Sequence, residues 1–511
     1  MAIPGDALVR GENHLGLRYA WARAPRDVIP GAAERRPLAV AWDWLDVRDG
    51  RQHGAAGAEV VTGTIGGPPR SASFAPGHEL AIPLPSGGGA PIRISLRAVG
   101  RAGAGAQAGL RLAQPVLDVA DEVPAPEPAR VAAPRPNVIV YLVDTLRADH
   151  LGSYGYPRTT SPHLDAFARE ASVFRNAFAQ SSWTKPAVVS LFTGLLPQVH
   201  RVIPRTAAIP EALPLLPALL HDQGYATLGV VTNGNVSRAF GFARGFDAYE
   251  HLREGTGPEI HQLSDRANQV AFKLLAQRPD DRPFFLYVHT ADPHWPYTPR
   301  EPFRTRLAGD LSDPEAGHAS LRSPSAPIAS LRRDVSQLYD GEIAFNDNSF
   351  GLFLEKMHEL DLYTGSLIIF LSDHGEGFYE RGSFRHGTTL FAEEVQIPLV
   401  IRFPGGAGAG RVVETAARQI DVLPTILDCV GAPIPDGLPG HSLRPAALRD
   451  GPGPEPGPTL AYLDRGGRVV EAAIDGGHKL IRFRVEGRGA PSLGLFDLAA
   501  DPGETLGYLD E

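Results

Sequence analysis

The sequence predicts an α/β fold, in which helices flank a central and mostly parallel sheet. Two nearly unbroken apolar runs, residues 137–143 and 366–372, are typical of strands buried on both faces of such a sheet. Each run ends abruptly in polar residues, Asp144 after the first and Asp373 with His374 after the second. Because ligands bind beyond the carboxyl ends of strands in open α/β sheets, these strand ends mark the predicted site.

Further strands and helices are predicted around these two runs. Short apolar segments at residues 225–231, 283–289 and 397–403 predict strands. Residues 161–171 predict a helix with a capping serine and a proline in its first turn. Residues 335–360 predict a long helix, whereas residues 304–330 show no clear period and predict a surface loop.

The two ends of the chain differ in pattern from the middle. Residues 1–120 predict a β-rich N-terminal module, because runs such as 38–46 and 91–99 partly alternate at strand period. Residues 121–136 predict a Pro-rich linker, residues 137–455 the main domain, and residues 456–511 a small C-terminal subdomain. For the N-terminal module, a packing role is favoured over a carbohydrate-binding role.

Composition limits the class of protein. The 511 residues carry a formal charge of −9, with 43% hydrophobic and 21% charged residues, which fits a globular protein and gives no basic surface for nucleic acid. No apolar run reaches the about 20 residues of a membrane span. The first residues lack a signal-peptide core, so a cytoplasmic location is expected, or a periplasmic or secreted one if the natural start lies upstream. A single cysteine, Cys429, excludes an intramolecular disulfide.

The polar strand ends have the chemistry of a metal site. Carboxylate oxygens suit Mg²⁺, Ca²⁺ and Mn²⁺, and an imidazole widens the choice to Zn²⁺. Asp144, Asp373 and His374 supply both kinds of ligand. We therefore expect one divalent ion, of Ca, Mg, Mn or Zn, at this edge of the sheet.

A hydroxyl is predicted beside this ion. Residues 184–194 predict a helix, with Pro186 in the first turn and Gly194 at the end. Thr184 then lies at the helix N-terminus, where free N–H groups and the helix dipole favour an oxyanion. Thr184 is a candidate nucleophile; the alternative is that it only caps the helix.

Ten short blocks carry a resemblance to the sulfatase family of the alkaline phosphatase superfamily. In order they are DTLRADHLG (144–152), TKPAVVSLFTG (184–194), GYAT (224–227), GFARGFD (241–247), DPHWPY (292–297), DHGE (373–376), HG (386–387), IPL (397–399), DVLPT (421–425) and FDLAADPGE (496–504). The resemblance implies an alkaline-phosphatase-like fold with a small C-terminal antiparallel sheet. It also implies that the Thr184 oxygen completes the metal ligands.

The position of Thr184 departs from the family. Sulfatases carry a Cys or Ser there, in a Cys-x-Pro-x-Arg pattern, and that residue becomes formylglycine, whereas this chain reads TKPAV at 184–188. An unmodified threonine must form an ester that water then attacks, and phosphoryl esters at metal sites do this readily. The departure therefore favours phosphate monoesters or diesters over sulfate esters.

Other polar residues are candidates for contact with the substrate. His294 and His386 are predicted to be catalytic, as groups that bind anionic oxygens or protonate the leaving group. His289, Asn233, Lys185 and Arg147 are predicted to bind the substrate. The family resemblance would place a lysine at His386, and a Lys-x-His where residues 232–234 stand.

The sequence thus predicts a metal-dependent hydrolase of phosphate or sulfate esters that acts through Thr184. The expected substrate is a small-molecule, glycan or lipid ester. Three alternatives stay open: a phosphotransferase of the same superfamily, a true sulfatase, and a catalytically silent binding protein. A second metal ion at Asp292 is a further alternative.

Overall fold

The computed structural model divides the chain into two compact units, Met1–Val131 and Ala132–Glu511. In the first unit it describes the backbone of four strands. In the second it describes residues 135–252, 263–278, 282–313, 316–318, 328–382, 384–448, 457–485, 487, 491–505 and 508–510, with backbone only at 328 and 508–510.

The four strands of the first unit form one antiparallel sheet. They are β1 (His14–Leu17), β2 (Gly57–Thr64), β3 (Arg70–Phe74) and β4 (Ile92–Val99), in the order β1-β4-β2-β3. The run predicted at 91–99 coincides with β4. The run at 38–46 and residues 121–134 of the predicted linker lie outside the described residues.

The second unit is built on an eight-stranded, mixed sheet. Its order is β15-β6-β14-β11-β5-β10-β8-β9, and the five strands from β11 to β9 are parallel to one another. The strands are β5 (Asn137–Val143), β6 (Ser172–Phe174), β8 (Ala226–Val231), β9 (Ala248–His251), β10 (Phe284–Thr290), β11 (Ser366–Ser372), β14 (Leu399–Arg402) and β15 (Arg411–Val413). The α/β prediction with a mostly parallel central sheet is confirmed.

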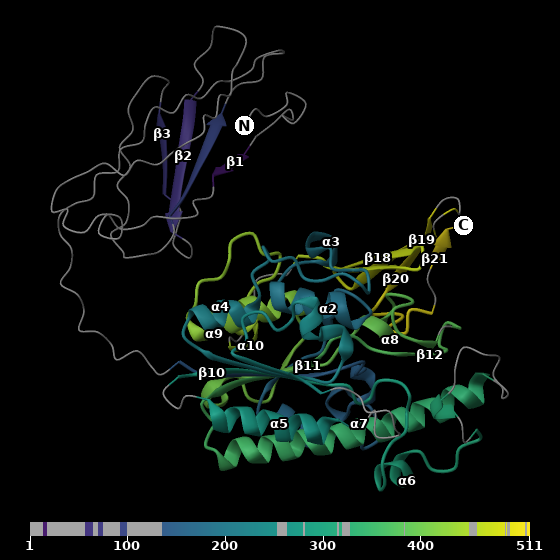
Figure 1. Cartoon of the computed structure of the whole chain (residues 1–511). Helices are drawn as coiled ribbons and strands as arrows, with labels where there is room; N and C mark the ends of the chain where they lie inside the picture. The colour runs from purple at the N-terminus through teal and green to yellow at the C-terminus, as the bar shows by residue number, and fades with distance from the viewer. Residues whose placement is uncertain are drawn as a thin grey trace. The chain divides into compact units, whose positions relative to one another are not determined.

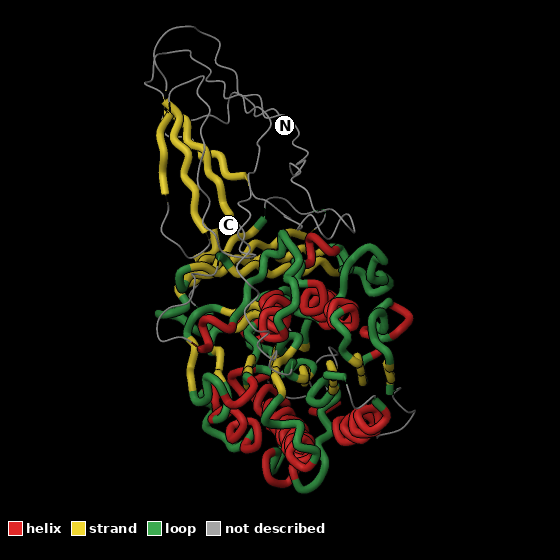
Figure 2. Tube along the Cα trace, turned by 90° about the vertical axis from the view of Figure 1, so that its left-hand side faces the viewer, coloured by secondary structure: helices red, strands yellow, loops and turns green. Residues whose placement is uncertain are grey.

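Helices cover both faces of this sheet (Figure 1). One face packs on α2 (Thr184–Thr193), α4 (Leu216–Asp222) and α9 (Val422–Val430), and the other on α1 (Pro162–Arg169), α5 (Ser264–Gln277) and α7 (Ile328–Glu359). The view turned by 90° shows helices on both sides of the strands again (Figure 2). Along β5, Val140 belongs to the first core and its neighbour Tyr141 to the second, which explains why the run has no charged residue.

Most of the other predicted elements have the expected type. The helices predicted at 161–171 and 335–360 correspond to α1 and α7, and α1 has Pro162 at its start. The segment 304–330 was predicted as a surface loop and differs in part: it contains most of α6 (Phe303–Leu307), the short η7 (Ala316–His318) and the start of α7. The helices α6 and η7 have only five and three residues, which is too few to show a helical period in the sequence.

The C-terminal region forms a separate antiparallel sheet. Its five strands, in order, are β17 (Thr459–Arg465), β18 (Arg468–Asp475), β19 (His478–Val485), β20 (Ser492–Asp497) and β21 (Tyr508–Asp510). A third apolar cluster joins this sheet to the main domain, and Trp183, which directly precedes α2, lies in it beside Leu463 and Val470. The N–H of Tyr462 also donates to the Gln180 carbonyl at 2.9 Å.

The remaining elements are short and connect these layers. The strands are β7 (Ala177–Phe178), β12 (Gly377–Phe378), β13 (Phe384–Arg385) and β16 (Ala417–Arg418), and the helices are α3 (Pro197–His200), α8 (Ala392–Val395), α10 (Arg444–Leu448), η3 (Ala148–His150), η4 (Gly152–Tyr154), η5 (Gly234–Val236), η6 (Arg238–Phe240), η8 (Pro404–Gly406) and η9 (Gln419–Asp421). Among the described residues, no helix combines the length and the apolar character that crossing a membrane requires.

Candidate active site

The two strand ends singled out by the sequence lie side by side. Strands β5 and β11 are parallel neighbours with Val143 opposite Ser372, so Asp144 and Asp373 follow at the same edge of the sheet. The Asp373 carboxylate accepts a hydrogen bond from the Thr145 N–H at 3.1 Å, and the Ser372 hydroxyl donates to the Val143 carbonyl at 2.7 Å. These bonds fix the separation of the two carboxylates.

Two histidines complete a buried group around these carboxylates. Ligand atoms of Asp144, His289 and Asp373 lie within 4.8 Å of one another. His374 belongs to the same group, because its Nε2 lies 3.7 Å from Asp144 Oδ1 and 3.4 Å from Asp373 Oδ2. His289 Nε2 lies 3.4 Å from Asp144 Oδ2, while its Nδ1 lies 3.0 Å from the Tyr287 hydroxyl. The four side chains are fully buried.

Burial and the neighbouring groups shift the pKa values of the side chains in this group. Burial raises the pKa of Asp373, and the charge of Asp144 raises it further. Burial opposes ionisation of Asp144 as well, but the hydrogen bond from His289 and the nearby histidine charges hold the pKa of Asp144 below its usual range. Burial lowers the pKa of His374 to about 3, so its imidazole is neutral and can bind a metal.

Two carboxylate oxygens show that the group fits a divalent ion. Asp144 Oδ1 and Asp373 Oδ2 are buried and have no hydrogen-bond partner among the described residues. Buried oxygens without partners are rare because they lose their hydration, and a bound cation would replace it. With the imidazole of His374, they form the oxygen and nitrogen set that Mn²⁺ and Zn²⁺ accept, while the carboxylates suit Ca²⁺ and Mg²⁺.

Thr184 is the first residue of α2 and points its hydroxyl at this group. Its Oγ1 lies 3.3 Å from His374 Nε2, and the residue is 1% exposed. Pro186 lies in the first turn of α2, and Gly194 ends the helix with φ of 68°. Thr184, Asp144, Asp373 and His374, the four predicted metal ligands, thus come together in the structure.

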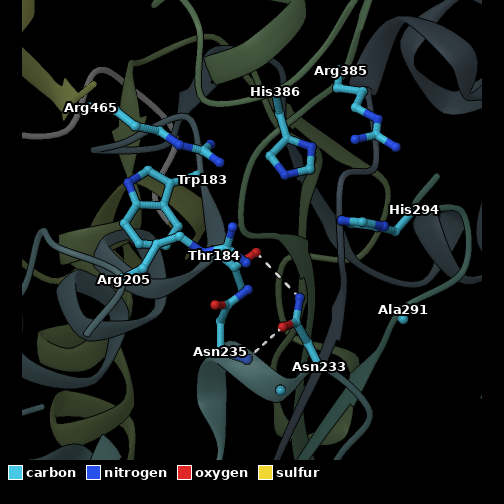
Figure 3. Close-up of a pocket in the computed structure, with 11 residues that line it drawn as sticks. Trp183, Thr184, Arg205, Asn233, Asn235, Ala291, His294, Arg385, His386 and Arg465 are labelled. Atoms are coloured by element: carbon cyan, nitrogen blue, oxygen red, sulfur yellow. Dashed lines mark hydrogen bonds between the residues drawn. The ribbon is translucent and has the colours of Figure 1, made fainter. Parts of the chain in front are cut away.

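Asn233 connects Thr184 with Asp144. Its Nδ2 lies 2.5 Å from Asp144 Oδ2 and 3.4 Å from Thr184 Oγ1, and its Oδ1 accepts the Asn235 N–H at 2.8 Å (Figure 3). The bond from Asn235 fixes the amide so that the NH₂ group faces the hydroxyl. Asn233 therefore both forms the turn before η5 and offers a donor to an oxygen bound at Thr184.

Above Thr184 opens a pocket of about 440 Å³ that receives His294 and His386. Its lining consists of Trp183, Thr184, Arg205, Asn233, Gly234, Asn235, Ala291, His294, Arg385, His386 and Arg465 (Figure 3). His386 Nδ1 lies 2.9 Å from Glu376 Oε1, and His294 Nδ1 lies 2.6 Å from the Trp295 carbonyl. Because each contact uses Nδ1, each ring keeps Nε2 for a ligand or a proton transfer.

Three predicted substrate-binding residues lie elsewhere. His289 belongs to the buried metal group and does not line the pocket. Lys185 extends away from the pocket, since its ammonium donates to the carbonyls of Arg205 and Ala207. Arg147 is occupied by ion pairs with Asp149 and Glu380. In both cases a nearby acceptor on the protein binds the cation that was assigned to the substrate.

Asp292, the alternative second metal ligand, also has another role. Its Oδ2 accepts the Ser264 N–H at 3.1 Å, and the structure does not include it in the metal group or the pocket lining. Burial raises the pKa of Asp292 to about 7.

Several pocket residues were not predicted from the sequence. They are Arg205, Arg385 and Arg465 on the pocket wall, and Glu376, which orients His386. Glu376 could have been identified from the sequence, because it belongs to the DHGE block that contains Asp373 and His374. The arginines come from three separate segments, and only the folded chain brings them together.

Similarity to known proteins identifies the family to which this chain belongs. The sulfatase family profile matches residues 136–432, and a second profile, the C-terminal region of N-sulphoglucosamine sulphohydrolase, matches residues 380–511. The chain belongs to the sulfatase family, within the alkaline phosphatase superfamily. It is an ester hydrolase of that family.

Curated relatives include both sulfatases and a multifunctional enzyme. An "Ulvan-active sulfatase" from Formosa agariphila is 28% identical over 410 residues, which cover 72% of this chain and 76% of the relative. The "Multifunctional alkaline phosphatase superfamily protein PehA" of Trinickia caryophylli is 26% identical over 399 residues, covering 62% of this chain and 77% of PehA. Most of the other curated relatives compared carry sulfatase names.

Solved structures share the fold at lower identity. The phosphonate monoester hydrolase of Agrobacterium radiobacter matches with a TM-score of 0.61 at 22% identity, covering 72% of this chain and 90% of that one. A protein solved in complex with its substrate D-glucosamine-2-N,6-O-disulfate matches with a TM-score of 0.58 at 20% identity, covering 72% and 92%. The comparisons therefore favour the sulfatase alternative over the phosphate preference inferred from Thr184.

Proposed function

We propose that this chain hydrolyses a sulfate ester of a sugar, with Thr184 as its nucleophile. The observation that carries the proposal is the position of the Thr184 hydroxyl. It lies at the N-terminus of α2, 3.3 Å from the neutral His374 and within reach of the Asn233 amide, at the floor of a pocket lined by arginines. The sulfatase names among the relatives support the choice of ester.

The reaction has two displacements. The Thr184 hydroxyl gives its proton to solvent, and its oxygen attacks the sulfur while the bond to the alcohol breaks. The alcohol leaves with a proton from His294 or His386, which that imidazole then regains from solvent. Water then attacks the threonyl ester, which restores the hydroxyl and releases the inorganic ion. The Asn233 NH₂ group and the N-terminus of α2 stabilise negative charge on the ester oxygens. A bound divalent cation would lower the pKa of the hydroxyl and neutralise ester charge.

A second candidate substrate is a phosphonate monoester or a phosphodiester. It is favoured by Thr184 itself, because a threonine lacks the aldehyde hydrate through which formylglycine releases sulfate. These esters, like a sulfate ester, carry one negative charge at a tetrahedral centre, so the same pocket can bind them. The phosphonate monoester hydrolase fold match is in keeping with this candidate.

The test compares four nitrophenyl esters on one metal-supplemented preparation: the sulfate, the phenylphosphonate, the phosphodiester and the phosphate monoester. We expect the highest kcat/KM for the sulfate, and a loss of about 10³-fold or more in the turnover of every ester by Thr184→Ala. A higher value for the phosphonate or the phosphodiester would select the second candidate. Activity that stays near the wild-type level in Thr184→Ala would contradict both, since it would come from another nucleophile or from a contaminant.

Mass spectrometry of acid-quenched reactions locates the nucleophile independently. A covalent adduct is expected on the peptide that contains Thr184. Ser181 and Ser182 are also buried, and their hydroxyls have no hydrogen-bond partner among the described residues. An adduct on either serine would therefore assign the nucleophile to that residue.

A further inference from the structure

A second hollow adjoins the pocket above Thr184. It has a volume of about 360 Å³ and shares Arg385, His386 and Arg465 with the first pocket. Its other lining residues are Phe384, Gly387, Thr388, Leu463, Gly466 and Arg468. Within the described residues, the lining of neither hollow includes an aspartate or a glutamate. The second hollow is thus positively charged and shares part of its wall with the pocket above Thr184.

Two of its arginines face each other across a hairpin. Arg465 ends β17, Arg468 begins β18, and the two are directly paired across a turn of Gly466 and Gly467. Both glycines have positive φ, 62° and 75°, as a tight two-residue hairpin turn requires. Directly opposed residues project on the same face of the sheet, and like charges in such a pair are destabilising. Stability of the hairpin therefore does not explain this pair.

Uncharged groups hold these two arginines in place. Arg468 donates to the Thr388 carbonyl at 3.3 Å, and the Arg465 guanidinium lies over the Trp183 ring at 5.5 Å. Arg465 also packs against Gly387, where a Cβ atom would collide with the guanidinium. Neither Arg465 nor Arg468 takes part in an ion pair with another described residue. Both positive charges are therefore available to a ligand.

Arg385 supplies a third cation between the two hollows. Its Cζ lies 3.3 Å from the centroid of the Trp295 ring, which fixes the guanidinium plane. Its Nε is buried without a hydrogen-bond partner in the described part of the chain. Figure 3 shows Arg385, His386 and Arg465 on the side of the pocket opposite Asn233 and Asn235. An unpaired, partly buried guanidinium at this position is suited to bind an anion.

We propose that Arg385, Arg465 and Arg468 form a subsite for a second anionic group of the substrate, a sulfate or carboxylate carried by the sugar. The scissile ester lies at Thr184, and the sugar extends past His386 so that its second anion reaches the hairpin. This assignment rests on the proposed function for the position of the scissile group. It makes the preferred substrate a sugar with at least two negative charges.

The test measures binding rather than turnover, so that it does not depend on the reaction. The probes are glucosamine 6-O-sulfate and glucosamine-2-N,6-O-disulfate, titrated by calorimetry into the metal-loaded Thr184→Ala protein. We expect the disulfate to bind about tenfold more tightly, and the advantage to shrink at high salt because Arg465 and Arg468 are exposed. In Arg465→Gln/Arg468→Gln on the same background, this advantage should disappear, because the disulfate should lose about tenfold more affinity than the monosulfate, whose single anion lies at Thr184.

Arg482→Gln is the matched control, because Arg482 is exposed on the adjacent strand β19 and pairs with Glu471 instead. It should keep the full preference. The double variant should also melt no lower than its parent, since it removes a like-charge pair. Equal affinities for the two sugars, binding by neither, or a preference that survives the double variant would overturn the subsite. Failure of the proposed function would instead appear as absent ester turnover in the wild-type chain.

Discussion

The inner and outer ends of the pocket differ in how their charges are stabilised. At the inner end, Asp144, Asp373 and His374 are fully buried, and each side chain is held by contacts to the others or to the backbone. At the outer end, Arg465 and Arg468 are exposed and lie outside any ion pair of the described residues. The central sheet positions the residues of the inner end, whereas a hairpin of the C-terminal sheet positions those of the outer end.

This difference separates chemistry from recognition. A buried charge without its partner is costly, so a change at the inner end should affect metal binding, catalysis and stability together. An exposed arginine is screened by water and salt, so a change at the outer end should affect only affinity for a charged substrate. Substitutions at the inner end, and then at residues nearer the outer end, can test this separation.

The largest effect is expected at Thr184. Thr184→Ala should lower kcat by about 10³-fold or more, because only binding and electrostatic stabilisation remain once a nucleophile is removed. Ser181→Ala and Ser182→Ala are matched controls that remove a buried hydroxyl nearby. Steady-state kinetics of all three variants decide the point, and a greater loss in either serine variant would contradict the assignment of Thr184.

Removal of the metal should come next. Chelation should abolish turnover, and added Mn²⁺, Ca²⁺, Mg²⁺ or Zn²⁺ should restore it and raise the melting temperature by binding the folded state. Because the pKa of Asp373 is raised, metal affinity should increase with pH as this carboxyl loses its proton. Asp373→Asn, which resembles the protonated form, should show no thermal stabilisation by metal. If metal stabilises this variant as strongly as wild type, Asp373 is not a ligand.

The two pocket histidines should have intermediate effects. His294→Gln and His386→Gln should each lower kcat, and the one that donates the proton should lower it by about 10²-fold. That variant should lose more activity on an alkyl ester than on a nitrophenyl ester, because only the alkyl alcohol needs the proton to leave. Equal losses on both esters in both variants would exclude proton donation by either residue.

The smallest effect is expected on the pH dependence of stability, through the loop of residues 386–389 that lines the pocket. Glu394 accepts hydrogen bonds from Thr388 and Thr389, which follow His386, and burial raises the pKa of Glu394 to about 7. A carboxyl with a raised pKa in the folded state binds a proton more tightly there than in the unfolded chain. Stability should therefore fall as the pH rises from about 4.5 through 7. In Glu394→Gln this decline should be shallower, as melting temperatures between pH 5 and pH 8 would show; an identical slope would argue against this role.

The sequence predicted the inner end better than the outer one. Strands β5 and β11 are apolar on both faces, so their ends and the adjacent Asp144 and Asp373 could be located from pattern alone. Arg465 and Arg468 lie at a Gly-Gly turn, which is readable as a hairpin, but its place at the pocket depends on how the C-terminal sheet packs.

The charged residues that were assigned to the substrate show a second limit. Lys185 directly follows Thr184 in the chain, but the helix directs its side chain towards the carbonyls of Arg205 and Ala207. Arg147 follows Asp144 closely but pairs with Glu380. Proximity in sequence fixed the backbone positions of these residues, whereas the partner of a long cationic side chain depended on distant segments.

The packing of Trp183, which precedes the proposed nucleophile, has a consequence for how the binding properties of this fold can change. Trp183 is packed under the C-terminal sheet, and the same sheet carries the Arg465–Arg468 hairpin. The strands of this sheet thus support the segment that leads into Thr184, the proposed nucleophile, and the two-glycine turn lies beyond them at the tip of the hairpin. Under the proposed function, a lineage or a protein engineer could replace the four residues 465–468 to favour a differently charged sugar, while the strands that pack on Trp183 stay unchanged.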